Sequence, residues 1–380
     1  MNILDQQIIL EFFRGNYWWF LTSTFLGTFG VTFYLIPKVL WVSKEKNLMA
    51  SVNERSSHTT AVPTFGGVAF YITIILVLSL LQGLRLTYIG NHLIAAITIL
   101  FMVGLKDDLV ISTARVKLVG QITAALFLIF SPELDFNNLH GFVGIHEIPA
   151  LVGYLLKAFL VLGLVNAYNL IDGIDGLAAI IGILIAAVFA LVFYTTGEPY
   201  YVLVSISVAG ILSAFLRFNF SRGRNKIFMG DAGSLVIGLI LSFLSLKILV
   251  MEPDLPLMEQ GYHPGNRLLF LACALFIPIF DTLRVIIIRK LNGNSPFEPD
   301  RNHLHHVLLD LGLSHFKASI SLGLLNLVII GIFFSLSNKL SHLYLVLLVV
   351  LLYAFSFLLF GWLSSLKKRI PVAAKETSGT

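Results

Sequence analysis

Charge and cysteine are both scarce in this chain. Only 12% of its 380 residues are Asp, Glu, Lys or Arg, whereas about 25% is usual for a soluble domain. The single cysteine, Cys273, cannot form a disulfide within the chain, so no disulfide framework of an oxidising compartment is present. The net charge of +5 is too small to indicate nucleic-acid binding. These shortages exclude an ordinary soluble enzyme and a disulfide-stabilised scaffold.

Long apolar stretches dominate the sequence instead. Apolar residues make up 57% of the chain, and the mean hydropathy is +0.87. About 20 consecutive apolar residues cross a bilayer core, so we predict an all-α polytopic membrane protein with about eleven transmembrane helices. The predicted spans are about 17–40, 65–83, 91–106, 117–132, 150–169, 176–194, 200–217, 233–250, 268–289, 318–337 and 341–363.

These spans form one predicted domain over residues 1–380, with a core of about 17–363. Residues 371–380 are predicted to be a short disordered tail. The first 16 residues carry Asp5, Glu11 and Arg14 without an apolar core, so they do not match a cleavable signal peptide.

Basic residues predict the orientation of the chain. When the N-terminus is placed outside and the spans alternate, all but six of the 26 Lys and Arg fall on the cytoplasmic side. The six are Arg14, Arg85, Lys157, Lys247, Arg267 and Lys339. The excess of Lys and Arg in cytoplasmic segments therefore favours an outside N-terminus and a cytoplasmic C-terminus.

Acidic residues gather on the same predicted face. They are Asp107, Asp108, Asp172, Asp175, Asp231, Asp281 and Asp300. Inserting one Asp at mid-helix costs about 2.5–3.5 kcal/mol, so several at the inner ends of helices require water, cations or one another. The pattern predicts one acidic cavity that opens to the cytoplasm.

Two motifs supply four of these carboxylates. Asp107 and Asp108 follow Lys106 at the end of the third span and suit Mg²⁺, which prefers oxygen ligands; an ordinary charged helix end would look the same. In NAYNLIDGIDG (166–176), Asp172 and Asp175 have helical spacing, as do Asn166 and Asn169. The two glycines permit a turn and the close approach of a ligand. A polar hairpin between spans is the alternative.

Three further motifs carry groups suited to phosphate. In FMGDAGS (228–234), Asp231 opens a span, either as a helix cap or as a metal ligand beside a phosphate-binding helix start. DRNHLHH (300–306) is a solvated loop, a zinc site without cysteine, or a phosphate site in which Arg301 joins three imidazoles. RSSH (55–58) precedes PTFGG (63–67) and could meet a lipid phosphate, although a plain surface loop explains it as well.

In this order, the aspartate pair, NAYNLIDGIDGLAA, FMGDAGS and DRNHLHH resemble the signatures of the polyprenyl-phosphate N-acetylhexosamine-1-phosphate transferases, and RSSH…PTFGG is similar to their N-terminal motif. The resemblance covers about residues 50–310, and the eleven-span plan extends it over the chain. DRNHLHH resembles the WecA/TagO branch, which uses UDP-GlcNAc, more than the three consecutive histidines of the MraY branch, which uses UDP-MurNAc-pentapeptide. The segment 221–225 is longer and more basic than the usual link, so no role is transferred to Asn219.

The resemblance implies a glycosyl-1-phosphate transferase in the bacterial cytoplasmic (inner) membrane, with its active site facing the cytoplasm. We expect it to use Mg²⁺, with Mn²⁺ as a substitute, and to transfer GlcNAc-1-phosphate from UDP-GlcNAc to undecaprenyl phosphate as the initiating step of a cell-envelope polysaccharide. UDP-MurNAc-pentapeptide, UDP-GalNAc and a deoxy-acetamido sugar are the alternative donors, and a second copy of the chain in a homo-oligomer is a further candidate partner.

Residue roles follow from the motifs together with the resemblance. The expected catalytic residues are Asp107, Asp108, Asp172, Asp175, His303, His305 and His306. The expected substrate-binding residues are Asn166, Asn169, Arg301, Lys106, Arg55 and His58. The expected metal ligands are Asp231, Asp172 and Asp175. We expect direct attack by the lipid phosphate, which is already largely ionised because the second pKa of a phosphomonoester is about 6.

An ion or metal transporter is the alternative from another class. Transporters also gather carboxylates within the membrane, but near its midplane and often between internal repeats. This chain has its carboxylates at one predicted face and no recognisable repeat. Asp281 is the residue that best fits a transporter, and Arg284, one turn later, offers it a structural ion pair instead.

Overall fold

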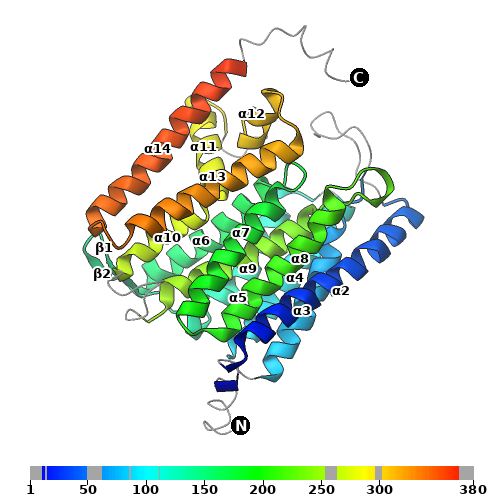
Figure 1. Ribbon diagram of the computed structural model, residues 1–380, viewed down its shortest axis with the longest axis horizontal. Helices are drawn as coiled ribbons and strands as arrows, with labels where there is room; N and C mark the ends of the chain where they lie inside the picture. Colours follow the sequence, from blue (N-terminus) through cyan, green and yellow to red (C-terminus); the bar gives the residue numbers. More distant parts are fainter. Residues whose placement is uncertain are drawn as a thin grey trace.

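The structure, a computed structural model, describes residues 11–12, 15–48, 62–84, 87–110, 112–252, 263–295 and 302–367. Long helices run alongside one another, and the first turn of α2 and the last turn of α14 lie at opposite ends of the molecule (Figure 1). The long helices are α2 (Tyr17–Glu45), α3 (Gly66–Gly83), α4 (Ile89–Leu109), α5 (Ala114–Ile129), α6 (Ala150–Leu170), α7 (Leu177–Thr195), α8 (Pro199–Asn219), α9 (Gly230–Val250), α11 (Phe276–Leu291), α13 (His315–Leu336) and α14 (His342–Lys367). The short elements are η1 (Pro132–Leu134), β1 (Asn138–Phe142), β2 (Ile145–Glu147), η2 (Gly223–Asn225), η3 (Pro264–Asn266), α10 (Arg267–Ala274) and α12 (Leu304–Asp310).

The predicted polytopic all-α membrane architecture is confirmed, with a slightly lower number of spans. In the described part of the chain, nine helices are long and apolar enough to cross a bilayer, and the bent pair α10–α11 can count as a tenth. The predicted span 117–132 corresponds to α5, which has only 16 residues. At about 1.5 Å per residue it is shorter than the hydrocarbon core of about 30 Å. The short antiparallel hairpin β1–β2, in a predicted outer loop, was not foreseen.

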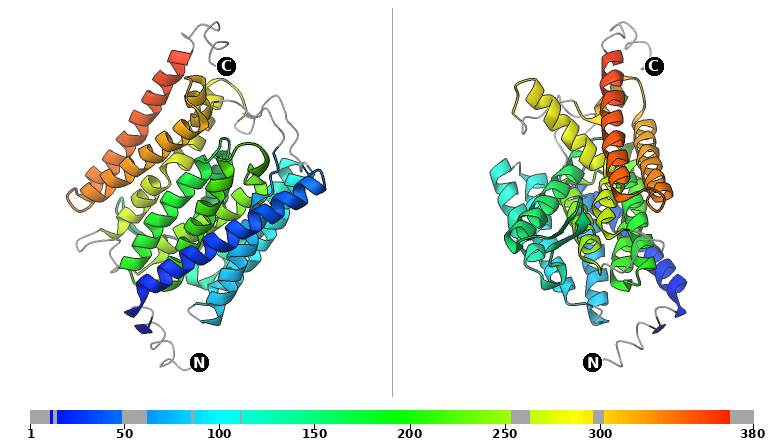
Figure 2. Two further views of the ribbon diagram at one scale, coloured as in Figure 1. Left: turned by 45° about the vertical axis from the view of Figure 1, so that its right-hand side comes forward. Right: turned by 90° about the vertical axis from the view of Figure 1, so that its left-hand side faces the viewer.

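Helix α9 forms the centre of the bundle, between α3, α4 and α6 (Figure 2). Its apolar stretch is 89% buried, compared with 22% for α2 and for α14 at the periphery. Glycines permit this packing: a Cβ on Gly67 would lie 2.2 Å from the Gly233 nitrogen, and a Cβ on Gly104 would lie 2.5 Å from the Cα atom of Ala232. Such backbone contacts are typical of small-residue helix packing in membranes. They hold the first turn of α9, which contains Asp231, between α3 and α4.

A break at Leu275 divides the predicted span 268–289 into α10 and α11, which meet at 73°. The buried side chain of Asn326, on α13, accepts a hydrogen bond from the Ile277 N–H at 3.0 Å and donates to the Ala274 carbonyl at 3.1 Å. Backbone groups freed inside a membrane need such partners because hydrocarbon supplies none. The bend redirects α11 toward α12, where Arg284 donates to the Asn302 carbonyl.

The β1–β2 hairpin is tied to the first turn of α14. His342 Nδ1 lies 2.6 Å from Asn266 Oδ1, and the Val143 N–H donates to His342 Nε2 at 3.1 Å. His140 Nε2 lies 3.1 Å from the Leu249 carbonyl at the other end of α9 from Asp231. The hairpin therefore stands at the end of the bundle opposite the aspartate motifs.

Candidate active site

Asp231 stands in the first turn of α9, with a lysine and an asparagine from two neighbouring helices. Lys117, on α5, forms an ion pair with Asp231 Oδ2, and its Nζ lies 4.0 Å from Asp107 Oδ2. Asn169, on α6, donates to Asp231 Oδ1 at 2.8 Å and to Ser234 Oγ at 2.7 Å. Sequence reasoning missed Lys117, which it counted only as one of the basic residues of the cytoplasmic face. Its place three residues after the start of a helix next to the aspartate pair was the available signal.

The Asp107–Asp108 pair ends α4 and lies against the start of α9. Asp108 accepts hydrogen bonds from the backbone N–H groups of Asp231 at 2.9 Å and Ala232 at 3.0 Å, one on each carboxylate oxygen. It thereby satisfies two of the N–H groups that every helix start leaves without an intrahelical partner. Asp107 accepts from the Ser112 N–H at 2.7 Å and directs its other oxygen toward Lys117. Asp108 therefore ties the end of α4 to the first turn of α9, which carries Asp231.

The Asp172–Asp175 hairpin connects α6 to α7. Asp175 Oδ2 lies 2.6 Å from Lys226 Nζ and 3.4 Å from His315 Nδ1. Gly176 adopts a φ of +78°, and its N–H donates to Asn219 Oδ1 at 2.6 Å. Asn219, to which no role was transferred from the resemblance, thus fixes the turn of this hairpin.

Asp172, the other carboxylate of the hairpin, is half-buried, as is Asp175. Among the described residues it has no hydrogen-bond partner. Burial raises its pKa well above the usual range, and the negative charges of Asp231, Asp108 and Asp175 raise it further. The four aspartates therefore lie close enough to repel one another, and the site favours a positive ligand.

The histidine segment packs on this hairpin. A Cβ on Gly173 would lie 2.3 Å from His305 Nε2, so only glycine leaves room for that ring. Burial lowers the pKa of His305 to about 3, which keeps it uncharged at neutral pH. His303 pairs with Asp281 at 2.8 Å, and the rings of His305 and His306 have centroids 4.3 Å apart. His305 therefore places the histidine segment against the hairpin that carries Asp172 and Asp175.

Other predicted site residues fall in different places. Asn166 exchanges hydrogen bonds of 3.1 and 3.0 Å with Gln121, so it joins α6 to α5 one turn away from Asn169. Lys106 is exposed. Arg55, His58 and Arg301 lie outside the described residues. The described part of the PTFGG motif pairs with FMGD through its backbone, since the Gly66 N–H donates to the Phe228 carbonyl at 3.0 Å.

The donor set of the site suits a hard cation better than zinc. Among the described residues, no group of three or more His, Cys, Asp or Glu side chains is arranged so that it could hold a metal ion. Zinc requires such a set of protein ligands. Mg²⁺ takes one or two carboxylates together with water and substrate phosphates, and Asp172 and Asp231 are carboxylates of this kind.

Comparisons with known proteins agree with this geometry. Residues 91–249 match the glycosyl transferase family 4. The decaprenyl-phosphate N-acetylglucosaminephosphotransferase of Mycobacterium tuberculosis is 31% identical over 311 residues, which cover 75% of this chain and 74% of that protein. A probable undecaprenyl-phosphate N-acetylglucosaminyl 1-phosphate transferase of Bacillus subtilis is 30% identical, over 75% of each chain. An undecaprenyl-phosphate alpha-N-acetylglucosaminyl 1-phosphate transferase of Salmonella typhi is 26% identical, over 83% of each chain.

The membrane-spanning fold, the aspartate site and these matches define a multi-pass membrane glycosyl-1-phosphate transferase. The chain belongs to glycosyl transferase family 4 and, within it, to the WecA/TagO-like branch of the polyprenyl-phosphate N-acetylhexosamine-1-phosphate transferases.

Proposed function

We propose that this enzyme transfers GlcNAc-1-phosphate from UDP-GlcNAc to undecaprenyl phosphate and releases UMP, as the first membrane step of a cell-envelope polysaccharide. The names of the related enzymes support an N-acetylglucosamine donor and a polyprenyl acceptor. The observation that carries the proposal is an apolar cavity, one end of which lies at about the same depth in the helix bundle as the aspartate site.

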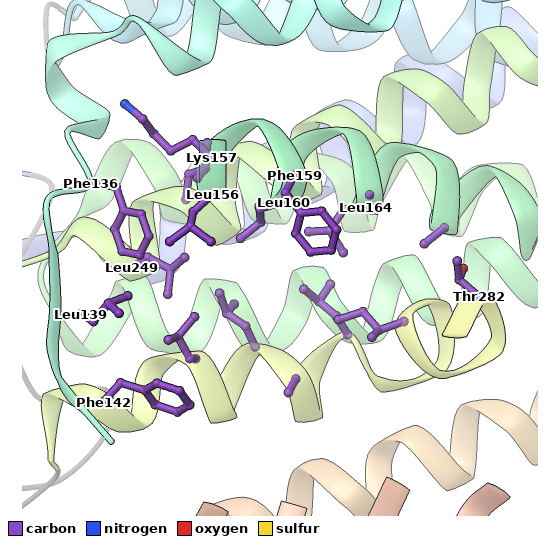
Figure 3. Close-up of a pocket in the computed structure, with 18 of the residues that line it drawn as sticks. Phe136, Leu139, Phe142, Leu156, Lys157, Phe159, Leu160, Leu164, Leu249 and Thr282 are labelled. Atoms are coloured by element: carbon purple, nitrogen blue, oxygen red, sulfur yellow. The ribbon is translucent and has the colours of Figure 1, made fainter. Parts of the chain in front are cut away.

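The cavity has a volume of about 460 Å³ and lies between α6, α9, α10 and α11. Figure 3 shows Phe136, Leu139 and Phe142 at one end and Thr282 at the other. Apart from Lys157 and Thr282, its lining side chains are apolar. The volume lies within the usual range of ligand pockets, about 300–1,000 Å³, and the lining suits isoprene units.

One end of this cavity lies near the residues that bind the aspartates and histidines. Ala167, which lines it, precedes Asn169 by two residues, and Asn169 binds Asp231. Thr282 directly follows Asp281, which binds His303. A polyprenyl chain in the cavity would therefore bring its phosphate to the level of the aspartates and histidines.

The proposed reaction forms one bond and breaks one. A phosphate oxygen of the lipid attacks the β-phosphorus of UDP-GlcNAc, and the bond from that phosphorus to the bridging oxygen breaks with its electron pair leaving on UMP. Two dianions react and two dianions form, so no net proton transfer is required. The barrier arises mainly from bringing anions together, and positioning and positive charge lower it.

The chain's own residues would divide this work. Lys117 supplies positive charge beside Asp107 and Asp231. Asn169 orients Asp231, and Asp108 holds the helix turn that carries it. Asp231 and Asp172, with Asp175 nearby, would hold Mg²⁺ together with the nucleotide phosphates. When bound, the ion supplies charge stabilisation for the diphosphate.

The proposed orientation places the aspartate site on the cytoplasmic side. It is supported by the distribution of Lys and Arg, all but six of which fall on that side when the N-terminus is outside. A bacterial cytoplasmic membrane is supported by the bacterial relatives. Fusion reporters after Arg224 should read cytoplasmic and those after Asp135 external; the reverse result would refute the orientation.

The test is a direct assay of the purified full-length protein. With undecaprenyl phosphate and Mg²⁺, UDP-GlcNAc should release UMP much faster than UDP-MurNAc-pentapeptide, UDP-GalNAc or a deoxy-acetamido sugar. Removal of divalent ions by EDTA should abolish turnover, and Mg²⁺ or Mn²⁺ should restore it. Faster turnover of another donor would assign that sugar instead, and the absence of UMP release with every donor would refute the proposed reaction.

A further inference from the structure

The buried carboxylate of Asp281 holds one of the three histidines of the 303–306 segment. Its side chain is only 2% exposed. Oδ2 lies 2.8 Å from His303 Nδ1, and Oδ1 accepts a hydrogen bond from the Leu304 N–H, also at 2.8 Å. One side chain on α11 thus fixes both the ring of His303 and the first turn of α12.

These partners decide which ring nitrogen of His303 is engaged. An ionised carboxylate only accepts hydrogen bonds. Nδ1 must therefore carry a hydrogen and donate a hydrogen bond to Asp281. Nε2 is then the ring nitrogen that remains for a ligand. A buried carboxylate behind an imidazole fixes the orientation and stabilises the imidazolium in many enzymes.

His305 provides a contrast within the same motif. Its ring is nearly parallel to that of His303, at 14° and with centroids 5.6 Å apart. In the described part of the chain, its buried Nδ1 has no hydrogen-bond partner, and burial lowers its pKa to about 3. His305 therefore fills the space against Gly173 as a neutral ring, whereas His303 has an anion bound directly to it.

We propose that Asp281 is a positioning residue for His303, whose imidazolium donates from Nε2 to a phosphate oxygen of the nucleotide sugar. The inference rests on the proposed function, which supplies the phosphate. The charged and titratable groups of the surrounding elements include Asp281 and Arg284 on α11, His305 and His306 on α12, and His315 at the start of α13; α11 also carries Arg289 and Lys290, α12 carries Asp310 and α13 carries Lys317. The neighbouring basic side chains repel a positive charge on the His303 ring, and the carboxylate of Asp281 offsets this repulsion.

The decisive variant is Asp281→Asn. Asparagine keeps an oxygen for the Leu304 N–H but presents an N–H to His303 Nδ1, which turns that nitrogen into an acceptor and removes the anion. We expect kcat/KM for UDP-GlcNAc to fall about 10²–10³-fold, as after the loss of one positioned electrostatic stabiliser. The pH dependence of kcat/KM should also change, because the variant lacks the carboxylate that contacts His303.

A double-mutant cycle separates this role from simple stabilisation. His303→Gln should lower kcat/KM by a similar factor, and adding Asp281→Asn to it should change kcat/KM less than about threefold, because residues that act as one unit are not additive. Ser314→Ala is the matched control, since Ser314 caps α13 by accepting from the Lys317 N–H. It should lower the melting temperature slightly and leave kcat/KM unchanged.

A purely structural Asp281 would give the opposite pattern. Asp281→Asn would then lower the melting temperature without moving the pH profile, and it would reduce activity further in the His303→Gln background; either result overturns the proposal. If Asp281→Asn does not fold, Asp281→Glu displaces the ring while keeping the charge, and an unchanged kcat/KM in that variant also overturns it. Failure of the unaltered enzyme to release UMP refutes the proposed function instead.

Discussion

The two aspartate pairs of the site differ in how much of each is already engaged by the protein. At the end of α4, Asp108 binds two amides of α9 and Asp107 binds the Ser112 amide. In the α6–α7 hairpin, Asp175 pairs with Lys226, whereas Asp172 has no hydrogen-bond partner among the described residues. The two pairs look alike in sequence but differ in structure. Asp107, Asp108 and Asp175 bind other groups of the protein, whereas the carboxylate of Asp172 remains for a ligand.

The largest effect should come from Asp172→Asn. We expect UMP release to fall about 10³-fold, comparable to the loss of one strong electrostatic stabiliser. The melting temperature should stay the same or rise, because the change removes a charge whose pKa is raised by burial and by three neighbouring carboxylates. A clear fall of the melting temperature in this variant would show that Asp172, like Asp108, stabilises the fold, and would contradict the difference drawn between the two pairs.

Asp108→Asn should combine a smaller loss of activity with a loss of stability. The amide presents an N–H to one of the two α9 donors, so a buried N–H is left without an acceptor, at a cost of about 1–3 kcal/mol. Turnover should fall about 10²-fold because Asp231 shifts with its helix turn. Thermal unfolding in detergent, measured beside UMP release, checks both changes. Intact stability together with lost turnover would instead assign Asp108 to the substrate.

Lys117→Met tests the cation that joins the two regions. Without Lys117, Asp107 and Asp231 lose a shared positive partner. We expect turnover to fall about 10-fold, which is less than the 10²–10³-fold lost with a donor that contacts the reacting group itself. The melting temperature without Mg²⁺ should also fall, and added Mg²⁺ should raise it more than in the unaltered enzyme. Lys339→Met, on an exposed lysine near the other end of the bundle, is the control and should show neither effect.

Asp175→Asn should have a modest effect, since its carboxylate is occupied by Lys226. Combining it with Lys226→Met in a double-mutant cycle should give a coupling free energy of about 1 kcal/mol in stability, as expected for neighbouring charged residues. Turnover of the single variant should fall less than about tenfold. Strictly additive stability effects would show that the ion pair contributes nothing.

The smallest effect concerns pH and the ring beside Asp172. The pKa of His305 is lowered from 6.5 to about 3 in the folded protein, so below pH 6.5 the unfolded chain binds a proton that the native chain does not. Stability should therefore fall as pH decreases from 7 to 5. His305→Gln should flatten this dependence in a thermal-unfolding series. An equally steep decline in the variant would assign it to other groups.

Much of the fold could be predicted because apolar length is a local property of the sequence. The exceptions depend on contacts between distant residues. The break at Leu275 is stabilised by Asn326, 49 residues after Ile277, and nothing in the apolar run 268–289 indicates it. The shortness of α5 and the β1–β2 hairpin were missed because hydropathy does not mark where a helix ends.

The site was predictable in its residue types but not in its pairings. Motifs identified all five aspartates of the site and the histidine segment, since carboxylates and imidazoles at membrane helix ends are unusual. The choice of Asp108 for the α9 amides depends on Gly67 and Gly104, which let two helices approach α9 closely. Lys117 and Lys226 were hidden among many basic residues of one face, because a lysine in sequence does not reveal its partner.

The amide of Asn326 also has a consequence for the order in which the chain is assembled. Ile277 and Ala274 are synthesised about fifty residues before the side chain that satisfies them. Until α13 enters the membrane, the α10–α11 corner exposes an N–H and a carbonyl that lipid cannot solvate. We therefore expect the nascent α10–α11 corner to stay in contact with water or the insertion machinery until α13 is made. In a ribosome-bound chain that ends before residue 326, the Ile277 N–H should exchange with solvent deuterium.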